Sequence, residues 1–298
     1  MDYLILKFPT FDEVLDCNEA YDEMYQKCLD MGIWTQEEML FQMKIMNIFT
    51  DKMENELNNL TNHPTFKYPP IKGIKNDNPV ELNKFIDKAM IEIIKGQRKI
   101  KTVDLFKYNE EEETQQYKDY KELSTLKNKY VRLTCEGFAD GAKNEKLVYY
   151  TVYKNENERL WGSYEEFLNS ESKLLVAGLS NKVIEFINGF SMTLLRKIAR
   201  HPSWRTRWIS ATKTGQSLFK GNISEWDQNK TYLCFWSNLY DSVYEIYPPV
   251  EKFILENDER LDNFLESRNK ENGKINDSQV EGTRAMFNSV HINPIKKK

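Results

Sequence analysis

The sequence has 298 residues, 40% of them hydrophobic and 13% aromatic, so it can fold around one large core or two ordinary ones. Its formal net charge of −4 argues against a general nucleic-acid-binding protein, which usually has a clearly basic balance. Only 12 glycines and 9 prolines argue against a fold rich in sheets and turns. No apolar run approaches the roughly 18 residues of a membrane span, and the first residues lack the basic leader of a signal peptide. We therefore expect a cytoplasmic chain with no membrane association.

The four cysteines are far apart in the chain and form no C-x-x-C pair: they are Cys17, Cys28, Cys135 and Cys234. This spacing indicates neither a disulfide framework nor a zinc knuckle. It predicts reduced and mostly buried thiols, which are typical of a cytosolic protein.

Residues 1–62 are predicted to form an acidic helical hairpin. Thr10 with Glu13, and Thr35 with Glu38, have the spacing of a capping box, which marks the start of a helix. Apolar residues follow each box at helical spacing, and Gly32 suits the position just after the first helix. The segment holds thirteen acidic residues against four lysines.

A Pro-rich linker is predicted for residues 63–79, and a helical arm for 80–129, with Pro79 in the first turn of its helix. Residues 130–161 are rich in β-branched and aromatic side chains, and Asp140-Gly141 is a common hairpin turn. These features predict a small antiparallel β-hairpin insert.

Residues 162–270 are predicted to form a helical bundle that is rich in Trp and Arg. Ser163 with Glu166 forms a third capping box, Pro202 suits the first turn of a helix, and Gly215 suits its end. Residues 271–298 are polar, end in three lysines and are predicted to be a flexible basic tail. The expected fold class is mainly α, with a helical hairpin, a C-terminal helical bundle and a small antiparallel β-hairpin insert.

The stretch 186–224 contains no acidic residue, yet it carries seven lysines and arginines with aromatic residues among them. Within it, residues 196–220 could hold phosphates and stack bases, which would make a nucleic-acid-binding surface. The arginines could instead pair inside the protein with acids of the following helix. A third interpretation is a protein interface, because Trp, Tyr and Arg anchor many of them. The candidate partner-binding residues are Trp204, Arg205, Arg207, Trp208, Phe219, Trp226, Trp236, Tyr240 and Tyr244. We also expect Trp204, Trp208 and Trp236 to form one internal aromatic cluster.

Catalytic patterns are weak throughout the sequence. None of the three histidines, His63, His201 and His291, has a metal ligand three or four residues away, and His201 before Pro202 suits a helix cap. The segment 212–217 resembles a phosphate-binding loop only in composition. Glu225 and Asp227 lie two residues apart at a helix start, where acids usually act as caps. We therefore expect a non-enzymatic protein with no catalytic residue, no metal and no cofactor.

Several segments resemble a family of proteins of large tailed bacteriophages. They include the "WRTRW" of residues 204–208, the "TG" and "LF" that follow it, the "FWS" and "YDSVYE" of residues 235–245, and the acidic "NDERLD" of residues 257–262. The resemblance extends upstream to "AYDEMY" at 20–25, "GIWTQEE" at 32–38 and "WGSYEEFL" at 161–168.

This resemblance implies a role in virion assembly, at the tail or baseplate hub. The chain would act as a chaperone or minor structural subunit that binds other phage virion or tail proteins, in the cytoplasm of the infected host cell or in the virion. The family supplies no catalytic residues. The alternative is a phage nucleic-acid-binding protein that uses residues 196–220. The sequence does not predict an oligomeric state.

Overall fold

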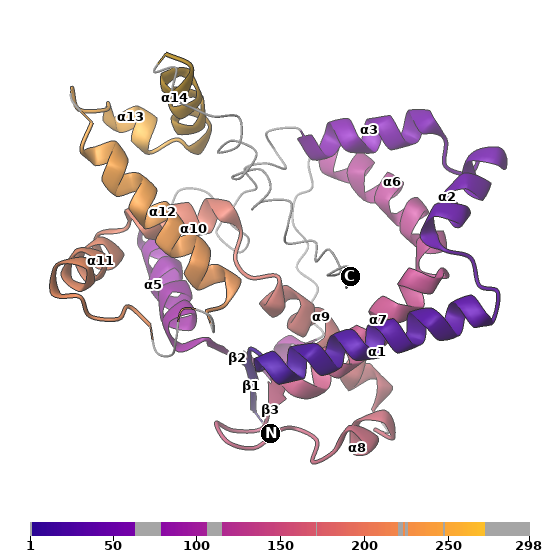
Figure 1. The fold of residues 1–298 in the computed structure, drawn as a ribbon. Coiled ribbons are helices and arrows are strands. Elements are labelled where there is room, and N and C mark those ends of the chain that lie inside the picture. Colours follow the sequence, from indigo (N-terminus) through magenta and orange to yellow (C-terminus); the bar gives the residue numbers. More distant parts are fainter. Residues whose placement is uncertain are drawn as a thin grey trace, which may run out of the picture. The chain divides into compact units, whose positions relative to one another are not determined.

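The computed structural model describes residues 2–62, 79–105, 115–170, 172–219, 223, 226–246 and 248–271. Its elements are mainly α-helices, with one small three-stranded antiparallel sheet, so the predicted fold class is confirmed (Figure 1). The predicted linker, apart from Pro79, and all but the first residue of the predicted tail lie outside the described residues. The chain divides into two compact units, residues 1–240 and 241–298.

The sheet is built around the first strand of the chain. Strand β1 (Tyr3–Lys7) lies in the middle and pairs antiparallel with β2 (Gln97–Lys101) on one side and β3 (Val152–Tyr153) on the other. Leu4 and Leu6 are buried in a core with side chains of the helices that cover the sheet. The members of this core from later in the chain include Val148, Trp161, Phe167, Leu179, Val183 and Phe186.

The placement of the sheet differs from the prediction for residues 130–161. Residues 135–151 form helix α7 (Cys135–Thr151), capped by the Thr134 hydroxyl. In this segment β3 joins the sheet, and Arg159 adds an isolated antiparallel bridge to Tyr153, so strand pairing is confined to residues near 152–160. The β-branched and aromatic residues near its end favour a strand locally, but long-range packing overrides such propensities. Gly137 also fits this helix start closely, since a Cβ there would lie 2.5 Å from the main chain of Arg132.

Helix α1 (Phe11–Asp30) packs along α7, and not along the helix that follows it as the predicted hairpin required (Figure 1). Contacts at both ends of this helix pair define its direction. After the end of α1, the Trp34 carbonyl accepts the amide of Cys135 at the start of α7. Before the start of α1, Leu6 pairs with β3, which directly follows the end of α7. The two helices therefore run antiparallel. Buried Cys17 and Cys28 lie on α1, and Cys135 is buried at the start of α7.

Charged residues fix the register of α1 against α7. Lys146 Nζ lies 2.7 Å from both carboxylate oxygens of Asp16, and the Tyr150 hydroxyl donates to the same carboxylate. These hydrogen bonds hold the pKa of Asp16 below its usual value, while burial and then Asp16 raise the pKa of Tyr150. One turn earlier on α1, Glu13 pairs with Arg159.

The single long helix expected after Thr35 is two helices, α2 (Gln36–Ile45) and α3 (Asp51–Asn62). Asn47 between them has φ of 55°, a conformation that Asn tolerates better than most residues. The turn lets Phe49 enter a small core between α2, α3 and α6 (Gln115–Val131). The members of that core are Met43, Phe49 and Leu57, with Tyr120, Leu123, Leu126 and Tyr130 packed on them.

The predicted helix starts are confirmed at Thr10, Thr35 and Pro79. Ser163 also caps its helix, although Glu166 accepts the amide of Gly162 and not that of Ser163. The remaining elements of the first unit are α5 (Pro79–Lys95), the short 3-10 helix η1 (Thr102–Asp104), α8 (Tyr164–Leu168), α9 (Lys173–Ile187), α10 (Met192–Arg200) and α11 (Pro202–Thr214). Helix α11 begins at Pro202 and ends at Gly215 with φ of 67°, as predicted.

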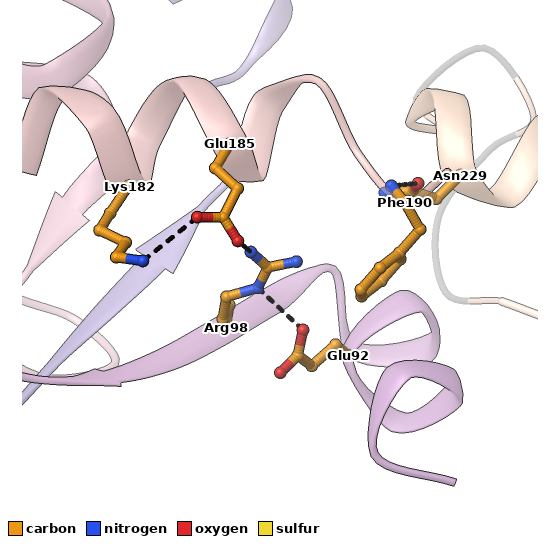
Figure 2. Close-up of polar contacts among 6 residues, drawn as sticks. All are labelled: Glu92, Arg98, Lys182, Glu185, Phe190 and Asn229. Carbon is orange, nitrogen blue, oxygen red and sulfur yellow. Dashed lines mark hydrogen bonds and ion pairs between the residues drawn. The ribbon is translucent and has the colours of Figure 1, made fainter. Parts of the chain in front are cut away.

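Arg98 of β2 joins two helices to the edge of the sheet. Its Nε lies 2.9 Å from Glu92 of α5, and its Nη1 lies 3.4 Å from Glu185 of α9 (Figure 2). The guanidinium also stands over the rings of Phe186 and Phe190, at 5.5 and 5.1 Å from their centroids. The strand, α5 and α9 are thus tied together by one side chain.

The turn between α9 and α10 is held by a residue of α12 (Gln228–Tyr244). Asn229 Oδ1 accepts the Phe190 amide at 2.8 Å (Figure 2). Gly189 has φ of 75°, and a Cβ there would lie 2.4 Å from the same Oδ1. Only glycine therefore fits this turn without displacing Asn229.

The second unit contains α13 (Lys252–Leu255) and α14 (Asp258–Glu271), which pack on each other. Leu261 is fully buried, and the Arg260 guanidinium lies 5.2 Å from the Phe253 ring centroid. In the described residues of both units, no helix combines the length and the apolar character needed to cross a membrane.

Candidate partner-binding surface

The aromatic side chains of α11 and the loop after it lie mostly inside the fold. Trp204 has no exposed surface, and its Nε1 donates to Ser237 Oγ of α12 at 2.7 Å. The Trp204 ring stacks on Phe219 with centroids 5.9 Å apart, and Phe219 meets Trp226 edge-on at 5.0 Å. These contacts join α11, the loop and α12 into one packed layer.

A second aromatic group on α12 holds two arginines of α10. The buried guanidinium of Arg196 lies 4.2 Å from the Trp236 ring centroid, and that of Arg200 lies 5.2 Å from the Tyr240 centroid. The two rings are themselves 6.4 Å apart. Cation–π contacts of this kind contribute about 0.5–2 kcal/mol each, so these arginines stabilise the packing of α10 on α12.

Other charged residues of this region also have contacts within the chain. Arg207 Nη2 donates to the Leu218 carbonyl at 2.8 Å. Asp227, one of the acids expected to pair with the arginines, lies 2.7 Å from Lys230 Nζ. Glu225 and Lys220 lie outside the described residues. Internal contacts therefore account for much of the basic stretch 196–220.

The nine predicted partner-binding residues separate by burial. Five are buried: Trp204, Trp208, Phe219, Trp236 and Tyr240. Arg205 and Trp226 are half-buried, while Arg207 and Tyr244 are exposed. All three members of the expected tryptophan cluster are thus internal, but the ring contacts described above place Trp204 and Trp236 in two different groups. The buried rings act as core, and their surfaces are not presented to a partner.

Helix α2 has an exposed apolar face whose aromatic and aliphatic residues were not among the nine predicted partner-binding residues. Met43 on one side of this helix is buried in the core with α3 and α6. On the opposite side, Phe41 is 61% exposed and Ile45 is 60% exposed. Trp34, just before the helix, is 45% exposed, and Met46 at its end is 59% exposed. One sequence signal does indicate this face: α2 carries apolar residues on all its sides, a pattern typical of a helix that other groups cover completely.

An acidic strip, which we define by Tyr21 and Tyr25 of α1 with Glu136 and Asp140 of α7, adjoins this face. Tyr21 and Tyr25 of α1 stack with ring centroids 6.1 Å apart. Burial, followed by the charges of Asp140 and Glu136 of α7, raises the pKa of Tyr21 to about 12. Burial, and then Glu136, Cys135 and Glu38, raise the pKa of Tyr25. The Gln36 amide donates to Glu136 at 2.7 Å, which joins the start of α2 to the strip.

The described histidine and cysteines that were considered for catalysis occupy positions typical of residues that stabilise the fold. His201 occupies the N-cap position of α11 as expected, without a capping hydrogen bond from its side chain, while His63 and His291 lie outside the described residues. All four cysteines are thiols, and burial raises the pKa of Cys17 to about 11. Across the described ranges, no three His, Cys, Asp or Glu side chains are grouped to hold a metal ion.

Comparison with protein-family models, with curated proteins and with solved structures finds no match to this chain.

Proposed function

We propose that this chain is a non-enzymatic bacteriophage protein that acts in virion assembly by binding other phage proteins. The observation that carries the binding role is the exposed apolar face of α2. Phe41 and Ile45 are each about three-fifths exposed, one helical turn apart, on a helix whose other side is already buried. Exposed aromatic and aliphatic side chains grouped in this way often mark a surface that a partner covers.

The phage assignment is supported by the sequence segments described above, which span residues 20–262. Part of the resemblance coincides with structural residues: Trp204, Phe219 and Trp236 stabilise the bundle around α12. The segment 32–38, by contrast, contains the exposed Trp34 and the first turn of α2, from which Glu38 extends along the exposed face. The same resemblance thus includes residues that build the fold and residues available to a partner.

Two roles in assembly fit this proposal. As a chaperone, the chain would cover an apolar surface of a tail or baseplate-hub component and then leave. As a minor structural subunit, it would stay in the particle. The nucleic-acid alternative is less favoured because Arg196, Arg200 and Arg207 of the basic stretch make contacts within the protein.

Quantitative mass spectrometry of purified particles beside infected-cell lysate tests the proposal. A fixed copy number in particles would identify a structural subunit. Abundance in lysate with co-purification of a tail or baseplate protein, and absence from particles, would identify a chaperone. Absence from particles with DNA as the sole co-purifying partner would refute the proposal in favour of nucleic-acid binding.

A further inference from the structure

We propose that the face of α2 and the adjoining acidic strip form a docking site for a basic amphipathic helix of a partner protein. This inference rests on the proposed function, because it specifies the chemistry of the partner that the binding role requires. We define the docking site by Tyr25, Glu38, Phe41, Ile45 and Glu136.

The side of the site that α2 supplies has the geometry of a helix-binding ridge, with Phe41 and Ile45 as its apolar members and Glu38 at its acidic end. Glu38, Phe41 and Ile45 are spaced i, i+3 and i+7, which places them along one face of α2 over about 10 Å. The opposite face is fixed by Met43 in the core with α3 and α6, so the exposed face cannot turn inward without breaking that core. The apolar residues are held rigidly toward solvent, as a preformed site requires.

The acidic part of the site has an unbalanced negative charge. Glu136 accepts the Gln36 amide at the start of α2, and Glu38 accepts the Thr35 amide at 2.8 Å. These contacts fix both carboxylates in place, and within the described part of the chain neither carboxylate forms an ion pair with a lysine or arginine. Nearby Asp140 is exposed and acidic as well, although its pKa is raised chiefly by burial, and Lys143 lowers that pKa by more than Glu136 raises it.

The lysine of α2 does not neutralise this site, because it pairs with carboxylates of α3. Lys44 of α2 lies 2.7 Å from both Asp51 and Glu54 of α3, so its charge is already matched by two carboxylates. The whole segment 1–62 holds thirteen acidic residues against four lysines. A lysine- or arginine-rich partner is therefore favoured electrostatically, and the tyrosine rings of the strip add faces on which such cations can lie.

A helix is the partner structure that combines these requirements. Its apolar side chains, repeated at i, i+3, i+4 and i+7, would cover Phe41 and Ile45 while flanking lysines or arginines reach Glu38 and Glu136. A symmetric second copy is disfavoured, because it would place the same acids of two chains against each other.

The test uses the full-length protein and three fluorescently labelled synthetic helices of about 18 residues, long enough for stable helix formation. The first contains Leu at helical spacing with Lys elsewhere. The second has Glu in place of Lys, and the third has the Leu and Lys of the first in a permuted order without an apolar face. Binding is followed by fluorescence anisotropy at low and high salt.

The matched variants distinguish peptide binding at the docking site from non-specific hydrophobic binding. Phe41→Gln with Ile45→Gln removes the apolar ridge but keeps good helix-forming residues. Leu174→Gln with Val80→Gln is the control, since these helical residues are 76% and 59% exposed elsewhere. Glu37→Gln with Asp140→Asn reduces the negative charge without removing a capping carboxylate. Circular dichroism verifies that each variant is folded.

We expect the amphipathic Lys peptide to bind the wild type and the control variant, and to bind the ridge variant about tenfold more weakly or worse. The charge variant should bind more weakly and with a smaller salt dependence. Failure of the wild type to prefer this peptide over the other two, or equal binding by the ridge variant, would overturn the inference. So would self-association of the wild type that the ridge variant abolishes.

A capture experiment from infected-cell lysate separates this inference from the proposed function. If wild type and ridge variant retain the same phage virion proteins, the docking site is assigned wrongly although the virion-assembly role stands. Loss of those proteins with the ridge variant alone supports both. If the peptide result holds but particles and lysate show no association with virion proteins, the virion-assembly role fails while the docking chemistry stands.

Discussion

Ser237 offers a direct test of how the bundle around α12 is held together. Its hydroxyl accepts the Trp204 indole N–H at 2.7 Å and donates to the Leu233 carbonyl at 2.7 Å, and both Trp204 and Ser237 have no exposed surface. Ser237→Ala would leave the indole N–H buried without this acceptor. An unsatisfied buried donor costs about 1–3 kcal/mol, and we expect the free energy of unfolding to fall by that amount.

Trp204→Phe supplies the second half of a double-mutant cycle. It removes the donor and roughly 40 Å³ of side chain, which at about 24 cal/mol per Å³ of cavity costs about 1 kcal/mol, besides the lost hydrogen bond. In the double variant no indole N–H is left unsatisfied. The double variant should therefore lose about 1–2 kcal/mol less than the sum of the single variants.

Urea denaturation followed by circular dichroism measures each free energy, provided that the dependence on urea concentration is unchanged among the variants. Losses that add within about 0.5 kcal/mol would show that the two groups are not coupled and would refute the argument. Complete truncation gives a coarser check: Trp208→Ala, at a side chain 7% exposed, should cost roughly 3–5 kcal/mol. A loss below about 1 kcal/mol, together with loss of a partner, would place that ring at an interface instead.

Three further predictions concern other parts of the chain. Gly189→Ala should cost more than about 1 kcal/mol in urea denaturation, because φ is 75° and the new Cβ would meet Asn229; an unchanged midpoint would contradict this. The pKa of Asp16 is lowered by hydrogen bonds from a lysine and then a tyrosine of α7, so its stabilisation is present above the unfolded-state pKa and is lost as pH falls through the lower folded-state pKa. The stability gap between wild type and Asp16→Asn should therefore shrink in acid, and a gap independent of pH would exclude this linkage. Finally, we expect no salt-dependent DNA affinity; such an affinity, if found and then abolished by Arg205→Glu with Arg207→Glu, would establish the alternative function.

The sequence was most informative where a structure depends on near neighbours. Thr10 and Thr35 cap their helices through residues three positions away, and Pro202 and Gly215 limit α11 by their own backbone preferences. Each of these signals depends only on residues within about one helical turn of each other. The helix at 135–151 was missed for the opposite reason: its packing partner is α1, more than a hundred residues earlier, and local β propensity pointed elsewhere.

The candidate site shows the same limit. Trp204 and Phe41 are both large aromatic residues within helices, and nothing in their local sequence states which one is covered. The structure buries Trp204 against Ser237 and leaves Phe41 61% exposed. Burial is decided by the neighbouring helix, so a sequence that shows an aromatic cluster can predict either a core or an interface.

The central position of β1 has a consequence for folding during synthesis. Residues 3–7 can complete their sheet only after residues 97–101 and then 152–153 have left the ribosome. At about 5–20 residues per second, the translation of the nearly 150 residues from β1 to β3 takes roughly 7–30 s. During that interval the apolar Leu4-Ile5-Leu6 segment has only part of its final cover. A nascent chain of this protein is therefore expected to need protection around residues 4–6, and slowing translation between β1 and residue 153 should increase its aggregation.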